Sequence, residues 1–399
     1  MGAAVLLASL GAFLCSLDSA LNVAFPAISA AFGVAPGRIA LLIVFYHVPI
    51  GVLTVIGGLL GDRFGHRRVF ACGVWTSALA FPLCGLAPDF TSLLVARAVQ
   101  GVGAGLVFGT APALVTLALA PARRAPGLGM LNVAAGAGLA LAPLIAGVLV
   151  DAFGWRSVFL FRVPLALVAA AALSLRRPPT VGREAWVPVD VPTLSRRLVL
   201  GNALAIAANA ASFSTFIFVP YYLVDVVRYP ASLTGAAFMA VPLSTSLGGL
   251  AGGWLTMRFA PRHLVVAGLA LETVGLFAIA SLDGTSRLPV IVAALGATGL
   301  GLGLFQVPNM ALVMAALPDK SQGLAGGMVS AMRTVGILTT AAAAPWFFAV
   351  RQASHRPIVG GPAALFVAAF SDTFLASAAL AACSLALALL LFTRAARGR

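Results

Sequence analysis

Long apolar stretches alternate with short polar segments along the whole chain, and this pattern predicts helices that cross a membrane. A helix needs about 20 apolar residues to cross the hydrocarbon core of a bilayer, which is about 30 Å thick. Twelve stretches of roughly this length lie near residues 4–28, 39–61, 69–87, 91–118, 127–150, 157–175, 198–226, 232–257, 264–282, 288–316, 325–350 and 364–393. The sequence therefore predicts an all-α membrane protein with twelve transmembrane helices.

The first stretch is interpreted as a retained span, because residues 1–17 have neither the basic start nor the small-residue cleavage site of a signal peptide. An even number of spans places both termini on the same side of the membrane. The loops on that side carry 16 of the 25 Lys and Arg residues, the other side carries seven, and Arg97 and Arg333 lie inside spans. Because basic loops stay in the cytoplasm, we expect both termini to be cytoplasmic.

The chain is predicted to consist of two six-helix bundles, at residues 1–175 and 198–399. Between them, residues 176–197 form the longest strongly polar stretch, with five Arg and four Pro. We interpret this stretch as a cytoplasmic linker.

The two halves resemble each other in sequence. Gly58–Phe64 aligns with Gly253–Phe259 at an offset of 195 residues, and Gly101–Gly105 aligns with Gly299–Gly303 at an offset of 198. Parallel repeats with a binding site at their interface are typical of secondary transporters.

Composition excludes several classes of protein. Hydrophobic residues make up 61% of the chain and charged residues 9%, against about 25% charged in an ordinary soluble protein. This excludes a soluble enzyme, a disordered chain and a disulfide scaffold. The net charge of +14 comes from basic residues scattered between apolar runs, so we expect no nucleic-acid partner. The use of 24 Arg against the single Lys320, with abundant Ala and Gly, is typical of a bacterium with high genomic GC content.

Catalytic and metal-binding patterns are not visible in the sequence. The four cysteines lie in apolar runs without metal-type spacing, and His47 is the only histidine inside a predicted span. We find no Ser-His-acid, metal-ligand or phosphate-loop motif, so we expect neither an enzyme nor a metal or cofactor.

Specific motifs make the chain similar to the major facilitator superfamily over its whole length. Gly58–Arg68, after the second span, matches the family's loop 2–3 motif nearly position by position, and Arg97–Gly105 matches the Arg-x-x-Gln-Gly-x-Gly motif of proton-coupled members. Gly138–Gly147 is similar to the antiporter motif of helix 5, with two glycines replaced by alanine. Leu17–Pro26 and Gly154–Phe159 resemble the drug:proton antiporter branch.

The resemblance implies a fold of two pseudo-symmetric bundles that work as a monomer by alternating access. The drug:proton branch usually has fourteen spans, so this chain resembles a twelve-span relative. The residues that would form the cytoplasmic gate are Gly58, Asp62, Arg63, Gly65 and Arg67, and those of the antiporter motif are Gly138, Pro143 and Gly147. Asp62 would accept hydrogen bonds from the backbone N–H groups at the start of the eleventh span, near 323–327. The alternative is that the arginines of this motif only fix the orientation of the chain in the membrane.

Proton coupling requires a group inside the membrane that can bind and release a proton, and carboxylates are the usual choice. Asp18 and Glu272 are the two acids near the middle of a predicted span. The family's geometry implies that Asp18 lies beside Arg97, and we expect Asp18 to bind the proton and Arg97 to modulate its affinity. A static ion pair that only holds two helices together is the alternative. Glu272 matches no family motif, and we expect it to be a second proton or cation site, or an acid bonded to a neighbouring helix.

Substrate recognition is expected to use polar residues inside the spans: Asn22, Tyr46, His47, Gln100, Asn132, Asn202, Asn209, Tyr222, Gln306, Asn309 and Arg333. Each could instead make an interhelical hydrogen bond. Arg162 stands where the related branch usually has Asn, and we expect it to extend to the membrane interface or to favour an anionic substrate.

These patterns together favour a proton-coupled exporter of a hydrophobic or amphipathic small molecule, such as a drug or secondary metabolite, in the inner membrane of a bacterium. An importer or exchanger of an organic anion on the same fold is the main alternative. A transporter-like sensor without turnover is a more distant one. The expected partners are the substrate, protons and the lipid bilayer.

Overall fold

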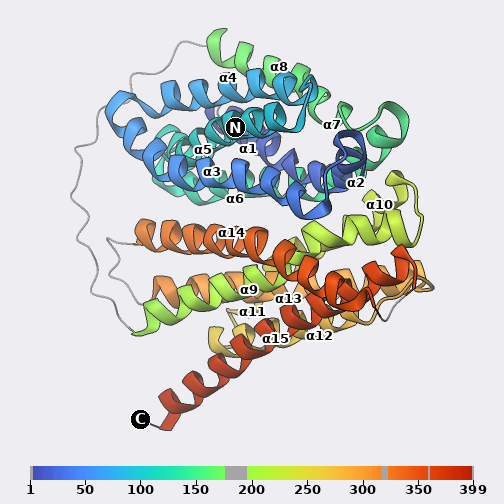
Figure 1. The fold of residues 1–399 in the computed structure, drawn as a ribbon. Helices are drawn as coiled ribbons and strands as arrows, with labels where there is room; N and C mark the ends of the chain where they lie inside the picture. Colours follow the sequence, from blue (N-terminus) through green and yellow to red (C-terminus); the bar gives the residue numbers. More distant parts are fainter. Residues whose placement is uncertain (1–2, 176–195, 316–321, 358–359, 398–399) are drawn as a thin grey trace. The chain divides into compact units, whose positions relative to one another are not determined.

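The computed structural model describes residues 3–175, 196–315, 322–357 and 360–397, and every regular element in them is helical (Figure 1). The chain divides into two compact units. Unit 1 contains Met1–Ala35 and Leu41–Pro188, and unit 2 contains Pro36–Ala40 and Val189–Arg399.

Unit 1 is a bundle in which α4 packs along α5, while α1 lies against α5 and α6. Its elements are α1 (Ala3–Ser16), η1 (Leu17–Ser19), α2 (Ala20–Phe32), α3 (Pro36–Phe64), α4 (His66–Gly85), α5 (Phe90–Ala118), α6 (Pro121–Phe153), α7 (Ser157–Leu160) and α8 (Arg162–Leu175).

Local sequence explains several of these helix ends. Pro36 and Pro121 occupy the first turns of α3 and α6, where a missing N–H costs nothing. Asp89 caps α5 by accepting a hydrogen bond from the Ser92 N–H at 2.8 Å, and this bond lowers the pKa of the Asp89 carboxyl. Gly33 ends α2 in the left-handed conformation.

The first predicted span is not one continuous α-helix. Residues 3–32 are helical throughout, but Leu17–Ser19 form a 3-10 turn between α1 and α2, with Asp18 in its middle. The Ser19 hydroxyl donates to the carbonyl of Leu139 in α6 at 2.9 Å. A 3-10 turn inside a longer helix often marks a functional hinge.

Unit 2 is a second bundle, in which α13 packs against α11 and α12, α9 against α14, and α15 against α12 and α9. Its elements are α9 (Arg196–Tyr221), the π-helical turn η2 (Tyr222–Val226), α10 (Ala231–Phe238), α11 (Ala240–Leu255), α12 (Pro261–Ala280), α13 (Leu288–Met314), α14 (Gln322–His355) and α15 (Pro362–Arg397). Residues 176–195 of the expected linker lie outside the described residues, and its last two residues begin α9.

The internal sequence repeat has a counterpart in the packing of each unit. Gly103 of α5 lies against the backbone of Ser77 in α4, and Gly301 of α13 lies against the backbone of Glu272 in α12. A Cβ atom at either glycine would collide with the neighbouring helix backbone. Glu272 therefore occupies in unit 2 the position that Ser77 occupies in unit 1.

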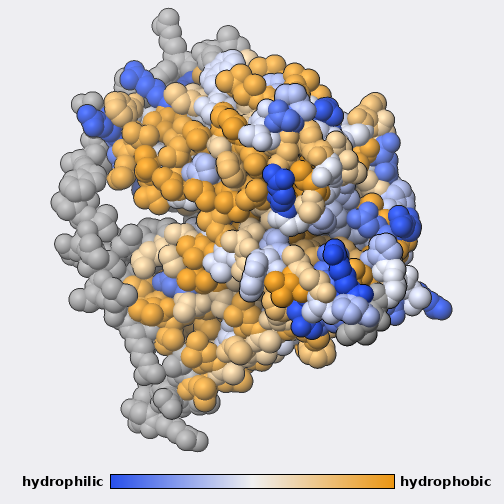
Figure 2. Space-filling model, in the orientation of Figure 1, coloured by the Kyte–Doolittle hydropathy of each residue, from blue (hydrophilic) through white to orange (hydrophobic). Residues whose placement is uncertain are grey.

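Eleven of the described helical segments are long and apolar enough to cross a membrane. The twelfth predicted span, near 157–175, is formed by α7 and α8, whose apolar stretch Ser157–Leu173 is shorter. Large side chains such as Leu79, Leu250 and Val274 lie exposed on the helices, and Figure 2 shows apolar residues gathered over both units on the visible face. Lipid is the solvent that such a surface requires.

Candidate functional site

The side chains of Asp18 and Arg97 form a buried ion pair inside unit 1. The Arg97 guanidinium, carried by α5, donates to both carboxylate oxygens of Asp18, at 2.6 Å to Oδ1 and 2.8 Å to Oδ2. The Arg97 side chain is 1% exposed and that of Asp18 12% exposed. This two-pronged geometry is the strongest form of the Arg–carboxylate interaction.

Gln100 lies one turn after Arg97 and completes the network. Its side-chain N–H donates to Asp18 Oδ1 at 2.8 Å, and its Oε1 accepts from Arg97 at 2.7 Å. The i, i+3 spacing on α5 places both side chains on the same face. The structure places Gln100, which was predicted to line a substrate cavity, in the ion-pair network, where its side chain is 2% exposed.

Arg162 is the second guanidinium at Asp18, and the expectation that it extends to the membrane interface is wrong. Its side chain is fully buried, with NH1 3.4 Å from Asp18 Oδ1 and Nε donating to the carbonyl of Val158. The guanidinium lies over the ring of Phe81 at 4.9 Å, and its NH2 group has no hydrogen-bond partner among the described residues. Arg162 is the first residue of α8, and its bond to Val158 reaches back across Phe161 to α7.

Two side chains of α3 complete the surroundings of the pair. The Tyr46 ring lies 4.1 Å from the Arg97 guanidinium carbon, and its hydroxyl donates to the carbonyl of Cys15 at 3.3 Å. His47 is half-buried and contacts the carbonyl of Ile43 through Nδ1 at 3.0 Å. The site thus sets two permanent cations against one carboxylate, so its charge balance depends on whether Asp18 is ionised.

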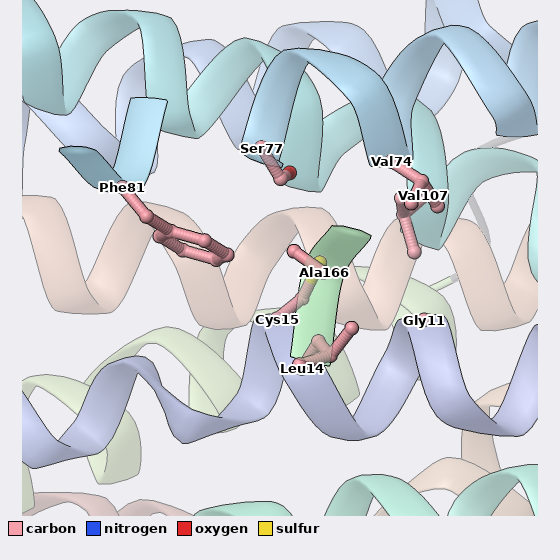
Figure 3. Close-up of a pocket in the computed structure, with 8 residues that line it drawn as sticks. All are labelled: Gly11, Leu14, Cys15, Val74, Ser77, Phe81, Val107 and Ala166. Carbon is pink, nitrogen blue, oxygen red and sulfur yellow. The ribbon is translucent and has the colours of Figure 1, made fainter. Parts of the chain in front are cut away.

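A small cavity lies in unit 1 between α1, α4, α5 and α8. It is lined by Gly11, Leu14, Cys15, Val74, Ser77, Phe81, Val107 and Ala166 (Figure 3). Its volume of about 10 Å³ is close to the minimum for one water molecule. It is therefore too small for a substrate.

Glu272 is the buried acid of unit 2. It is fully buried in α12, its Oε1 accepts from the Ser212 hydroxyl of α9 at 2.6 Å, and its Oε2 has no partner among the described residues. The side chain is turned inward and bonded to a neighbouring helix, which was one of the sequence-based alternatives. Among the described residues no cation pairs with it, so an ionised carboxylate here would be costly.

The other polar residues predicted for a cavity fall into two groups. Asn209 and Gln306 contact each other at 3.3 Å, Asn309 donates to the carbonyl of Gly201, and Tyr222 donates to that of Asp283. These four therefore make bonds between elements inside unit 2. The second group comprises Asn202, which is buried and donates to the carbonyl of Leu198 in its own helix, Asn22, which is half-buried, and Asn132 and Arg333, which are exposed.

The predicted gate motif forms a tight turn between α3 and α4. Gly65 has φ +95°, which favours glycine, and Asp62 contacts His66 Nε2 at 2.9 Å across the turn. Arg67 donates to the carbonyl of Leu173, while Arg63 is exposed. A Cβ at Gly58 would lie 3.7 Å from the carbonyl oxygen of Gly109, which is an ordinary van der Waals contact, whereas a Cβ at Gly61 would collide with the His66 ring.

The antiporter motif of α6 lies along α1. A Cβ at Gly138 would lie 2.6 Å from the carbonyl oxygen of Phe13, so glycine is needed for this close approach. Pro143 lies inside α6, and both it and Gly147 are buried.

A charged cluster that sequence reasoning missed lies where α14 ends and α15 begins. Asp372 Oδ2 accepts from Arg351 Nε at 2.7 Å and contacts His355 Nε2 at 2.6 Å. Arg351 and His355 are one helical turn apart near the end of a span, which is the signal that could have revealed them.

Comparison with known proteins places this geometry in a family. The model of the Major Facilitator Superfamily matches residues 7–338. The riboflavin transporter RibZ of Clostridioides difficile is 23% identical, with 85% of this chain and 86% of the relative covered. The multidrug resistance protein Stp of Mycobacterium tuberculosis is 27% identical, with 82% and 72% covered. The fold matches that of a bacterial homologue of the human lysosomal transporter Spinster, with a TM-score of 0.77, 17% identity and coverage of 97% and 96%.

Proposed function

The chain belongs to the Major Facilitator Superfamily, and from this we propose that it is a proton-coupled transporter that exports a hydrophobic or amphipathic small molecule. The family and fold are those of a multi-pass membrane transporter rather than an enzyme. The observation that carries the proposal is the network of Asp18, Arg97 and Gln100 inside unit 1. Export is supported by the similarity to a protein named for multidrug resistance.

Protonation of Asp18 is the proposed coupling step. The ionised carboxylate holds two Arg97 N–H groups, and protonation removes the charge that makes these bonds strong. Proton binding therefore releases the guanidinium, and proton loss restores the pair. We assign Glu272 to a second proton-binding position, and Asp62, Arg63 and Arg67 to a cytoplasmic latch in a twelve-span protein with both termini in the cytoplasm.

Proteoliposomes with an imposed pH gradient test the coupling step. A panel of dyes and antibiotics identifies a substrate first, with a protonophore as the control for coupling. Asp18→Asn is expected to abolish transport driven by the pH gradient while leaving substrate exchange at equal pH. Asp225→Asn, which removes an exposed carboxylate in the π-helical turn η2, is the matched control and is expected to transport normally. Undiminished proton-driven transport by Asp18→Asn would refute the proposal.

The second candidate is an exchanger or importer of an organic anion, and Arg162 is the observation that favours it. With two guanidinium groups at one carboxylate, the site carries an excess positive charge that suits an anion. The direction of substrate movement under an inward proton gradient separates the two candidates. Export supports the first, and uptake of a carboxylate or phosphate compound supports the second.

A further inference from the structure

A groove lies on unit 2 between α9, α14 and α15. Its volume is about 260 Å³, and it is lined by Ala210, Ser214, Thr339, Thr340, Ala343, Ala344, Trp346, Phe347, Thr373, Ala376, Ser377 and Leu380. The α9 residues are buried and form its floor, whereas Ala343, Trp346 and Ala376 are exposed at its mouth. The lining extends from Thr339 to Phe347 of α14, which is about 12 Å along the helix axis.

The hydroxyl groups of this groove are already bonded inside the protein. Thr340 donates to the carbonyl of Ala210 at 2.6 Å, Thr373 to that of Ala369 at 2.7 Å, and Thr339 to that of Val335 at 2.8 Å. Ser377 donates to Ser214 at 3.0 Å. With these donors used, and no charged residue in the lining, the groove presents mainly carbon to an occupant. It therefore suits a hydrocarbon chain better than a ligand that needs directional hydrogen bonds.

The charged cluster lies one turn beyond the groove on both of its walls. Arg351 follows Phe347 by four residues on α14, and Asp372 precedes Ala376 by four on α15. Asp372 accepts a hydrogen bond from the Nε of Arg351, whose side chain is 40% exposed. In the described part of the chain the two terminal nitrogens of Arg351 are therefore available to bind a ligand. Arg351 and the exposed Arg356 outnumber Asp372 in charge, and His355, whose Nε2 contacts Asp372, has its Nδ1 as a further polar atom beside them.

We propose that the groove binds an anionic phospholipid, with an acyl chain between α14 and α15 and the headgroup phosphate at Arg351 and His355. The arrangement of a carbon-lined slot with a basic cluster at its end matches the two parts of such a lipid. The planar guanidinium favours phosphate over a neutral headgroup. The lining of the groove shares no residue with the network of Asp18, Arg97 and Gln100 or with the pair of Glu272 and Ser212.

Delipidated protein in detergent tests the proposal by native mass spectrometry and thermal unfolding. The probes are phosphatidylglycerol and phosphatidylcholine with identical oleoyl chains. We expect tighter binding of phosphatidylglycerol, and Arg351→Gln is expected to weaken it by about tenfold, the effect of losing a charge-assisted hydrogen bond. Arg287→Gln, which removes an exposed charge at the start of α13, is the matched control and is expected to change nothing.

The acyl-chain slot is tested by Ala376→Phe, which fills the groove, against Ala379→Phe, which adds the same bulk at an exposed position of α15 outside it. Ala376→Phe is expected to weaken binding of both lipids, and Ala379→Phe to leave it unchanged. If Ala376→Phe does not fold, Ala343→Leu on the opposite wall replaces it. Equal binding of both lipids by the wild type and Arg351→Gln would overturn the proposal. So would a raised KM for the transport substrate in Ala376→Phe with lipid binding unchanged, because the groove would then hold substrate.

Discussion

The pair of Asp18 and Arg97 predicts a large energetic coupling that a double-mutant cycle can measure. Asp18→Asn leaves two guanidinium groups buried without a counter-charge, and removal of one partner of a buried pair typically costs about 3–5 kcal/mol. Arg97→Gln leaves Asp18 with Gln100 and the more distant Arg162. In the double variant neither Asp18 nor Arg97 is present as a buried charge without its partner. Its loss of stability is therefore expected to be smaller than the sum of the two single losses.

The magnitude follows from the number of charged hydrogen bonds. Two bonds join Arg97 to Asp18, at 2.6 and 2.8 Å, and each is worth about 1.5–3 kcal/mol. We expect a coupling energy of about 3 kcal/mol, the lower end of the sum of the two bonds, which for a unit of this size corresponds to about 6–12 °C in melting temperature. The double-mutant cycle of Asp18 with Arg162 is the internal comparison. These two side chains are joined by one contact at 3.4 Å, so we expect a smaller coupling energy between them.

Thermal unfolding of the wild type, the single variants and the double variants in one detergent gives both cycles. Monodispersity in size-exclusion chromatography confirms that each variant is folded before heating. A coupling below about 0.5 kcal/mol between Asp18 and Arg97, which is the scatter seen for independent sites, would refute the reasoning.

Further predictions concern other parts of the molecule. Arg162→Asn is expected to lower the melting temperature less than Arg97→Gln, because Arg162 makes only one long contact with Asp18. Gly301→Val is expected to abolish accumulation of folded protein, measured by fluorescence-detected chromatography, because its side chain collides with the backbone of Glu272. Asp89→Ala is expected to lower the melting temperature at neutral pH. That difference should disappear as the pH falls through the lowered pKa of Asp89, because the cap needs the ionised carboxylate; a constant difference across this range would contradict it. Asp62→Ala is expected to reduce the rate of turnover more than substrate affinity, and an unchanged turnover rate would count against the latch.

The sequence predicted the helices well because the apolar runs are long and their borders carry Pro, Gly and charge. It also predicted the partnership of Asp18 and Arg97, since the motif around Arg97 implies which helices are neighbours. The 3-10 turn at Leu17–Ser19 was missed, because these residues include neither Pro nor Gly, which would indicate an interruption of the α-helix.

The position of Arg162 could not be predicted from its place in the chain. A cation at the start of an apolar run is expected to extend toward water, whereas the Arg162 side chain is fully buried and contacts Asp18, a residue 144 positions earlier in the chain. The partners of Asp372 were missed for a similar reason, since Arg351 lies on a different helix and their proximity depends on how α14 and α15 pack. In both cases the direction of a side chain, rather than its depth in a span, decides its role.

The short stretch of tighter winding around Asp18 makes a local motion of the carboxylate geometrically simple. A 3-10 helix rises about 2.0 Å and rotates about 120° per residue, against about 1.5 Å and 100° in an α-helix. If residues 17–19 rewound to α geometry, the segment would shorten by about 1.5 Å and the following residues would rotate by about 60°. We expect such a displacement to lengthen the hydrogen bonds between Asp18 and Arg97, so a change of pitch in one helix offers a route by which this pair opens.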